Sequence, residues 1–355
     1  MNFTQPKQNL IACFKLFNSL EGFSKSLFRL ILHYSFVMPK LLLSLFFCSF
    51  FIQTKAGEAT EIKNQKYDRT LGYRPDEVIH YYEPTPTTKL GLHVFYPENH
   101  KSNDERTCIV FFYGGGWISG DPSQFYSYCK YFSSRGIIAI SAQYRNAKLN
   151  NVIPRECVED GREAIRYIRE HSKELGIDPK KIIAGGGSAG GHVAAAIAMC
   201  TSIDAKPKSK TGSIPNGLIL LNPVYHNGPK GGYGYGRVKE YWKAFSPFHN
   251  IQKGQPKTIC FFGTEDKFVP LSTIEAFQNE MDNVGNDCKT HLYEGQHHGF
   301  FNIPKGGREI FEDVLTKIDA FLVKNHFLTG ENKVNLWTTK AIIHFDELKK
   351  KSNHK

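Results

Sequence analysis

Short apolar segments that alternate with helical patterns are the feature that most constrains the fold of this 355-residue chain. The run Ile109-Val110-Phe111-Phe112 has no polar position, as expected for a strand buried on both faces of a parallel sheet. Strands are predicted at 77–82, 90–96, 107–113, 136–142, 181–184, 217–221, 258–262 and 289–293. Helices are predicted at 123–134, 155–174, 189–200, 271–284 and 308–325.

This alternation predicts an α/β fold with a mostly parallel eight-stranded sheet flanked by helices. Because no helix separates the first two strands, we expect the sheet to begin with an antiparallel pair. Residues 223–248 have no clear periodicity and are rich in Gly and Tyr. A long irregular insertion of this kind in a compact domain is often functional.

The N-terminal region carries the pattern of an export signal. Met38-Pro39-Lys40 precedes the apolar segment 41–52, which is about 12 residues long and too short to span a bilayer as a helix. Thr54-Lys55-Ala56 follows as a small-x-small cleavage site. We therefore expect a signal peptide at 38–56, a secreted or periplasmic product without a stable membrane anchor, and a mature start near Gly57.

Residues 1–37 are then interpreted as upstream sequence from a mis-assigned start, or alternatively as a genuine extension with an amphipathic segment. Residues 57–328 are expected to form one α/β domain. Residues 329–355, which end in a lysine-rich run, are expected to be a basic, partly disordered tail.

The formal net charge of +11 lies mainly at the two ends of the chain. Residues 1–56 contribute +5 and residues 322–355 contribute +4, which leaves +2 for the remainder. No nucleic-acid-binding motif accompanies this charge, so we do not expect a nucleic-acid partner. Among the eight cysteines, only Cys129 and Cys157 are interpreted as a plausible disulfide pair in an exported protein.

Gly186-Gly187-Ser188-Ala189-Gly190 is the first segment that indicates chemistry. It lies between the predicted strand at 181–184 and an Ala-rich helix. A serine on a sharp strand-to-helix turn needs glycines around it, because its backbone is strained and closely packed. Ser188 is therefore the candidate nucleophile, with a flexible Gly-rich turn as the alternative.

Tyr113-Gly114-Gly115-Gly116-Trp117 follows the third predicted strand. Glycines let backbone N–H groups turn toward a developing oxyanion. We assign Gly115, Gly116 and the N–H of Ala189 to an oxyanion hole. The two motifs in this order make an ordinary Gly-rich turn a poor explanation.

An acid and a base follow later predicted strands. Asp266 is the candidate acid, with the adjacent Glu265 as its competitor, and His298 is the candidate base. The chain order Ser, Asp, His matches that of enzymes whose nucleophilic serine lies on a turn between a strand and a helix. A metal site at His297 and His298 is not expected, because no further ligand lies at suitable spacing.

Other polar residues near these motifs are interpreted as structural. His192 is expected to hold the nucleophile turn, and His297 to lie at the surface or in a pocket wall. Arg145 and Asp160 are expected to form a structural ion pair.

Together the motifs at 113–117, 185–192, 263–267 and 298–301 resemble the acetyl esterase and carboxylesterase branch of the α/β hydrolases, related to hormone-sensitive-lipase-like esterases. The resemblance covers about residues 70–325 and is strongest to secreted carbohydrate esterases. Lipase-like members usually have His where this chain has Tyr113, which puts the subfamily in question rather than the chemistry.

The resemblance implies a serine esterase that cleaves short acyl esters through an acyl-enzyme, with no metal or cofactor. Its substrate would be a small acyl ester or an acetylated carbohydrate, with Trp117 and Tyr113 as substrate-binding residues and Trp242 as a further stacking surface. The alternatives are a catalytically inactive binding protein on the same scaffold, or a serine peptidase or lipase of the same fold. The sequence leaves the oligomeric state open.

Overall fold

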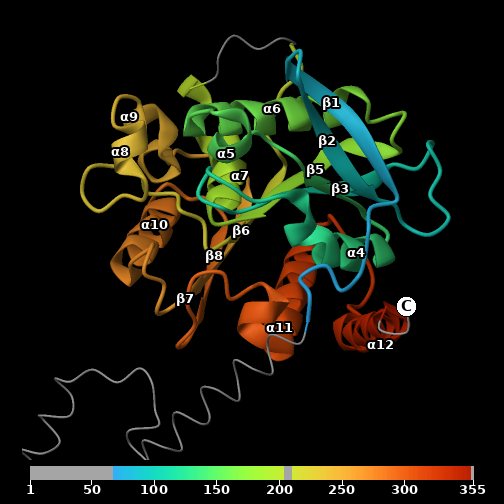
Figure 1. The fold of residues 1–355 in the computed structure, drawn as a ribbon. Coiled ribbons are helices and arrows are strands. Elements are labelled where there is room, and N and C mark those ends of the chain that lie inside the picture. Colours follow the sequence, from blue (N-terminus) through green and yellow to red (C-terminus); the bar gives the residue numbers. More distant parts are fainter. Residues whose placement is uncertain (1–66, 204–209, 353–355) are drawn as a thin grey trace, which may run out of the picture. The chain divides into compact units, whose positions relative to one another are not determined.

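The computed structural model describes residues 67–203 and 210–352. Its centre is an eight-stranded sheet in the order β1-β2-β4-β3-β5-β6-β7-β8 (Figure 1). The strands are β1 (Glu77–Thr85), β2 (Thr88–Phe95), β3 (Arg106–Phe112), β4 (Ile138–Ala142), β5 (Ile177–Gly187), β6 (Gly217–Leu221), β7 (Lys257–Gly263) and β8 (Cys288–Tyr293). β2 is antiparallel to both β1 and β4, and the remaining pairs are parallel. The predicted fold class is confirmed, and each predicted strand overlaps an observed one.

Helices cover both faces of the sheet (Figure 1). One face carries α6 (Pro154–Glu170), α7 (Ala189–Met199) and α10 (Leu271–Asn283). The other carries α4 (Tyr126–Ser134), α11 (Ile303–Lys324) and α12 (Val334–Ser352). The shorter helices are η1 (Pro122–Phe125), α5 (Ala147–Asn150), η2 (Thr201–Ile203), α8 (Tyr235–Val238), α9 (Trp242–Phe245) and η3 (Pro247–Asn250). The five predicted helices are all present.

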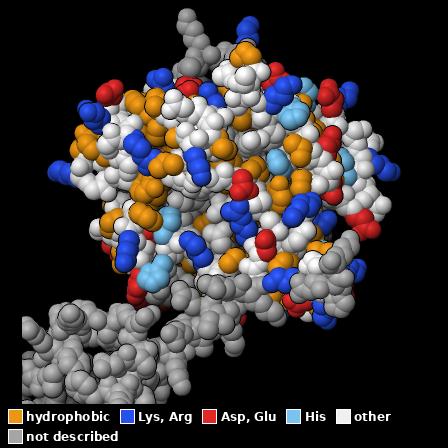
Figure 2. Space-filling model, in the orientation of Figure 1, with side chains coloured by type: hydrophobic (Ala, Val, Ile, Leu, Met, Phe, Trp, Pro, Cys, Tyr) orange, Lys and Arg blue, Asp and Glu red, His pale blue; other side chains and the backbone are white. Residues whose placement is uncertain are grey.

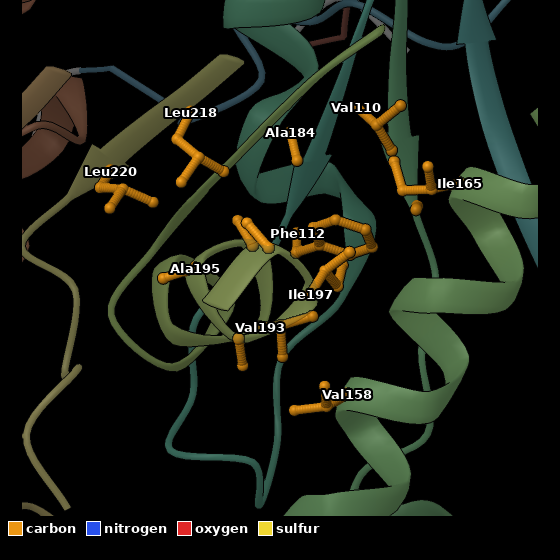
Figure 3. Close-up of a cluster of buried hydrophobic side chains, with 14 of the residues drawn as sticks. Val110, Phe112, Val158, Ile165, Ala184, Val193, Ala195, Ile197, Leu218 and Leu220 are labelled. Atoms are coloured by element: carbon orange, nitrogen blue, oxygen red, sulfur yellow. The ribbon is translucent and has the colours of Figure 1, made fainter. Parts of the chain in front are cut away.

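The core on the α6–α7 face is built from the apolar strands and a nearly all-apolar helix. Figure 3 shows Val110 of β3 and Ala184 of β5 among the side chains of α6 and α7, including Ile165 and Val193. All eleven residues of α7 are buried, and small alanines let this helix approach the sheet closely. This close approach fixes the start of α7, and hence the residue that precedes it.

The segment between β6 and β7 was expected to be irregular, but it contains α8, α9 and η3. Several of its polar groups bind one another. The Ser246 hydroxyl donates to the carbonyl of Tyr225 (3.1 Å) and accepts from the N–H of Asn227 (3.0 Å). Buried Phe245 packs edge-on against Trp117, with ring centroids 5.6 Å apart. The insertion is therefore an ordered cover over the start of α7.

The expectation of a partly disordered C-terminal tail is wrong for residues 334–352, which form α12. Val334, Ala341 and Phe345 are buried on one side of this helix. Trp337 stacks on Tyr73, with ring centroids 6.1 Å apart. The lysines of this helix are exposed, so the lysine-rich composition suggests a solvated tail although the helix has an apolar stripe.

The predicted Cys129–Cys157 disulfide is also wrong. Both cysteines are free and buried. Cys129 of α4 belongs to the core on one face of the sheet, and Cys157 of α6 belongs to the core on the other. The sheet separates the two thiols, and burial raises the pKa of both, so each behaves as a small apolar side chain.

The surface carries charges of both signs. Figure 2 shows basic and acidic side chains intermixed with apolar ones over the face in view. In the part of the chain that the structure describes, no helix is both long enough and apolar enough to cross a membrane. The predicted signal peptide at 38–56 and the extension at 1–37 lie outside the described residues.

Candidate active site

Ser188 lies on a sharp turn between β5 and α7, as predicted. Its backbone angles are φ +55° and ψ −119°, a strained conformation for a residue other than glycine. A Cβ on Gly186 would lie 2.5 Å from the backbone of Gly190, and a Cβ on Gly190 would overlap the carbonyl oxygen of Phe112. The turn is therefore held closed by glycines that allow β3, β5 and α7 to touch.

The structure brings Ser188, Asp266 and His298 together. The Oγ of Ser188 lies 2.8 Å from Nε2 of His298, and Nδ1 of His298 lies 2.7 Å from Oδ2 of Asp266. Asp266 follows β7 and His298 follows β8, so all three residues lie at the carboxyl ends of parallel strands. Brought together at that edge, they form a relay from a hydroxyl through an imidazole to a carboxylate.

The environment of Asp266 fixes the orientation of the ring. The carboxylate is fully buried, and its other oxygen accepts the N–H groups of Phe268 (2.8 Å) and Val269 (3.3 Å). Its partner atom Nδ1 of His298 must therefore donate, which leaves Nε2 as an acceptor for the Ser188 hydroxyl.

The neighbouring acid and histidine lie outside the relay. Glu265 is exposed and faces His297, which is also exposed, with 3.6 Å between Oε2 and Nδ1. The Nδ1 atom of His297 also lies 3.2 Å from the carbonyl oxygen of Glu265. The geometry therefore favours Asp266 over its competitor, and His297 lies at the surface as one of the two predicted options.

The Gly-rich loop after β3 reaches the nucleophile. A Cβ on Gly114 would lie 3.3 Å from the Cβ of Ser188. Gly115 and Gly116 have φ values of +123° and +65°, which glycine adopts without steric cost. Within residues 67–203 and 210–352, the N–H groups of Gly115, Gly116 and Ala189 donate no hydrogen bond, whereas that of Gly114 is bound to Gln124 Oε1 (2.6 Å). These three donors remain the candidate oxyanion hole.

The structure does not place the predicted substrate-binding residues Tyr113 and Trp117 at a substrate-accessible position. Each is only 1% exposed. The hydroxyl of Tyr113 donates to the carbonyl of Tyr144, and the hydroxyl of Tyr144 donates back to the carbonyl of Tyr113. Trp117 packs edge-on against His192, with ring centroids 4.9 Å apart. Both predictions are wrong because the loop doubles back and turns these rings into the core, where they support the glycines.

Two other aromatic residues line the site: Phe268, which the sequence analysis missed, and Tyr233, which belongs to the Gly- and Tyr-rich segment 223–248. Phe268 is half exposed, and its ring meets that of His298 edge-on at 4.8 Å between centroids. Tyr233 meets Phe268 at 5.5 Å, and its hydroxyl oxygen would lie 2.9 Å from a Cβ on Gly116. The two residues come from different loops, so only the fold reveals that they are neighbours.

These two rings form part of the wall of a small pocket of about 190 Å³, a volume that includes open solvent. Its lining residues are Val224, His226, Gly231, Tyr233, Phe268, Val269, Pro270 and Thr273. Burial lowers the pKa of His226, so this side chain is neutral near pH 7. The pocket wall therefore carries no charged side chain near pH 7.

The structural predictions for His192, Arg145 and Asp160 agree with their contacts. His192 is fully buried, and its Nε2 donates to the carbonyl of Phe245 (3.0 Å). Arg145 Nη2 lies 2.7 Å from Asp160 Oδ1 in a buried ion pair. Among the described residues, no group of three or more His, Cys, Asp or Glu side chains is placed to hold a metal ion.

Asn222 is a further polar residue that the sequence reasoning missed. It lies directly after β6, is fully buried, and contacts both His298 and Gly299. Its position could have identified it from the sequence, because polar residues at the carboxyl end of a central parallel strand often face the active site.

Two family models match the chain in succession, BD-FAE over residues 92–214 and the dienelactone hydrolase family over residues 233–319. A probable isoprenylcysteine alpha-carbonyl methylesterase of Arabidopsis thaliana is 28% identical over 269 residues, which is 67% of this chain and 54% of that protein. An acetylxylan esterase of Xylanibacter ruminicola is 25% identical, over 60% of this chain and 44% of that protein. This chain spans 54% to 63% of the length of the methylesterase relatives.

Solved structures give a fuller match. The apo form of Thermogutta terrifontis esterase 2 has a TM-score of 0.68 and 41% identity, covering 72% of this chain and 96% of that one. Its butyrate-bound form has a TM-score of 0.69 and 39% identity, covering 74% of this chain and 97% of that one. The likeness extends over nearly the whole of the solved enzyme. This chain therefore belongs to the α/β-hydrolase family of esterases.

Proposed function

We propose that this enzyme is a serine esterase that hydrolyses short acyl esters through an acyl-enzyme on Ser188. The observation that carries the proposal is the unbroken relay from Ser188 Oγ through His298 to Asp266, with spacings of 2.8 Å and 2.7 Å. Ser188 lies on a strained turn next to the N–H groups assigned to the oxyanion hole, which have no hydrogen-bond partner among the described residues. Nucleophile, base, orienting acid and oxyanion donors thus meet at one edge of the sheet.

The chemistry follows from these positions. Ser188 Oγ attacks the acyl carbon while His298 Nε2 takes its proton, and Asp266 stabilises the resulting imidazolium. The N–H groups of Gly115 and Ala189, with that of Gly116, receive the oxyanion, and each donor contributes roughly 3–4 kcal/mol. The imidazolium then gives its proton to the leaving alcohol. A water molecule, deprotonated by the same ring, releases the acid and regenerates Ser188.

The aromatic side chains beside His298 support a sugar ester as the substrate. Phe268 offers an exposed ring beside His298, and Tyr233 offers a second ring with a hydroxyl. Aromatic faces suit the apolar side of a sugar. The acetylxylan esterase among the relatives supports acetylated carbohydrate as the substrate class.

The test compares hydrolysis of p-nitrophenyl acetate, butyrate and octanoate by the wild type and three variants. Ser188→Ala and His298→Ala are expected to lower kcat/KM by about 10⁴-fold or more. His297→Ala serves as the matched control, because this exposed histidine lies next to the base but outside the relay. Equal losses at His297 and His298, or full activity of Ser188→Ala, would refute the proposed mechanism.

Substrate class needs a second measurement. Acetate release from acetylated xylan is compared with methanol release from a methyl ester, because some relatives carry the name methylesterase. We expect acetate release and a preference for p-nitrophenyl acetate over octanoate. Rapid methanol release with inert xylan would contradict the acetyl proposal while leaving the serine mechanism intact.

Export of the enzyme is part of the same proposal. It rests on the apolar segment 41–52 and the following Thr54-Lys55-Ala56. N-terminal sequencing of protein from the culture medium or periplasm is expected to give a start near Gly57. Material that retains Met1 would contradict this.

A further inference from the structure

Asn222 occupies a strained and fully buried position beside His298. It follows the last residue of β6, has φ +38°, and is completely buried. Asparagine is among the few residues that tolerate positive φ. Its side chain lies against two consecutive residues of the loop after β8: Oδ1 is 2.9 Å from the backbone N of Gly299, and Nδ2 is 3.3 Å from Nε2 of His298.

The orientation of this amide is fixed by chemistry. A backbone N–H can only donate, so the atom opposite Gly299 must be the amide oxygen. The NH₂ group of Asn222 therefore faces the ring of His298. Because Nδ1 of His298 donates to Asp266, its Nε2 carries a lone pair in the neutral ring. That lone pair accepts from both the Ser188 hydroxyl and the Asn222 amide.

We propose that Asn222 is a positioning residue that holds Nε2 of His298 beside Ser188 in its unprotonated, proton-accepting form. The inference rests on the proposed function, since it assigns His298 the role of base. A proton on Nε2 in the resting enzyme would face the NH₂ of Asn222, donor against donor. Asn222 thus opposes early protonation of the ring and favours transfer of the proton onward to the leaving group.

The backbone makes Asn222 a rigid support. Its own N–H donates to the carbonyl of Phe261 in β7 (2.7 Å). On either side, Ser188 N–H donates to the carbonyl of Leu221 (2.9 Å), and Val224 N–H donates to the carbonyl of Ser188 (3.3 Å). The exit of β6 is therefore tied to both the nucleophile turn and the strand that carries the acid.

Few other groups face the ring of His298. The buried carboxylate of Asp266 is its charged neighbour, and Phe268 covers it edge-on. The nearby Glu265 and His297 are exposed and lie against each other. In addition, Nζ of Lys305 would lie 3.0 Å from a Cβ on Gly299, the residue after His298. These groups are the same in the wild type and in variants at position 222, so their effect cancels when the two pH profiles are compared.

The test is the pH profile of kcat/KM for Asn222→Asp. Aspartate tolerates positive φ and keeps an acceptor for Gly299, but it replaces the NH₂ donor with an oxygen that accepts from a protonated ring. The acidic limb of kcat/KM, which reports the base of the free enzyme, is expected to move to higher pH by about one unit or more. Activity on the alkaline plateau is expected to stay within about tenfold of wild type, because the relay itself is intact.

Asn286→Asp is the matched control. Asn286 is also buried, accepts from the N–H of Gly254 (2.9 Å) and donates to the carbonyl of Gln252 (2.9 Å). It lies just before β8, whereas His298 lies just after it, so the two are at opposite ends of the strand. This variant is expected to leave the acidic limb unchanged even if it lowers the melting temperature.

Asn222→Gly provides a second variant, because glycine accepts the positive φ while losing the amide. Its acidic limb is also expected to move upward, with kcat falling and KM little changed. An unmoved limb in whichever of the two variants folds would overturn the inference and leave Asn222 a structural residue. If Ser188→Ala kept full activity, the proposed function itself would fail, so the two failures are distinguishable.

Discussion

Lowering the pH from 8 to 5 is expected to destabilise the fold through one buried side chain, His192. This residue lies in the first turn of α7, is fully buried, and sits between the rings of Trp117 and Phe245. Burial lowers the pKa of His192 from 6.5 to about 3. The unfolded chain therefore binds a proton as the pH falls below about 6.5, while the folded chain does not.

The magnitude follows from the interval between the working pH and the unfolded pKa. The stabilising contribution is fully present above about pH 6.5 and is lost as the pH falls toward about 3. One pKa unit corresponds to about 1.4 kcal/mol. At pH 5 the interval is about 1.5 units, so protonation of His192 in the unfolded chain costs about 2 kcal/mol of unfolding free energy.

Urea unfolding of the wild type and His192→Gln at pH 8 and pH 5 measures how much His192 contributes to the loss of unfolding free energy. Glutamine is neutral and can still donate to the carbonyl of Phe245. Other histidines with pKa values lowered by burial, including His93 and His291, are common to both proteins and cancel in the comparison. The wild type is expected to lose about 2 kcal/mol more than the variant between the two pH values. Equal losses would refute the reasoning.

Two further predictions concern the core and the pocket. Arg135→Met is expected to lower the unfolding free energy by about 3–5 kcal/mol in urea or thermal unfolding, because it leaves the buried carboxylate of Asp319 without the cation 2.7 Å away. Arg155 is exposed, so Arg155→Met is expected to lower it by less than about 1 kcal/mol, and equal losses in the two variants would contradict the argument. Phe268→Ala is expected to raise KM for p-nitrophenyl acetate about fivefold or more, because the substrate loses an apolar contact that contributes roughly 1 kcal/mol or more to binding. Leu271→Ala is the control, since Leu271 is partly exposed and lies outside the pocket lining; an unchanged KM for Phe268→Ala would show that this ring does not contact the substrate.

Most of the fold was predictable because its strands are buried on both faces. A run such as Ile109-Val110-Phe111-Phe112 has no polar position in the sequence and no exposed residue in the sheet. The predicted bounds of β6 agree with the observed ones. The C-terminal helix was missed because the lysine-rich run at 349–351, which follows buried Ala341 and Phe345, made composition outweigh the apolar spacing.

The geometry of the proposed triad was predictable because each member lies in the turn or loop that follows a strand, in a fixed chain order. Parallel strands bring their carboxyl ends to one edge, so sequence position alone places Ser188, Asp266 and His298 near each other. The pocket wall was not predictable in this way. Trp117 turns inward and Phe268 turns outward, and nothing in the local sequence distinguishes the two orientations. The pairing of Asn222 with His298 likewise exists only once β6 and β8 are placed in the sheet.

Covalent labelling of Ser188 tests the central claim most directly. The wild type and Ser188→Ala are incubated with paraoxon, and the products are analysed by intact mass and peptide mapping. The account predicts one diethylphosphoryl group per wild-type chain, on the peptide that contains Ser188, with parallel loss of esterase activity and no labelling of the variant. A label on another residue, or esterase activity that survives complete labelling of Ser188, would contradict it.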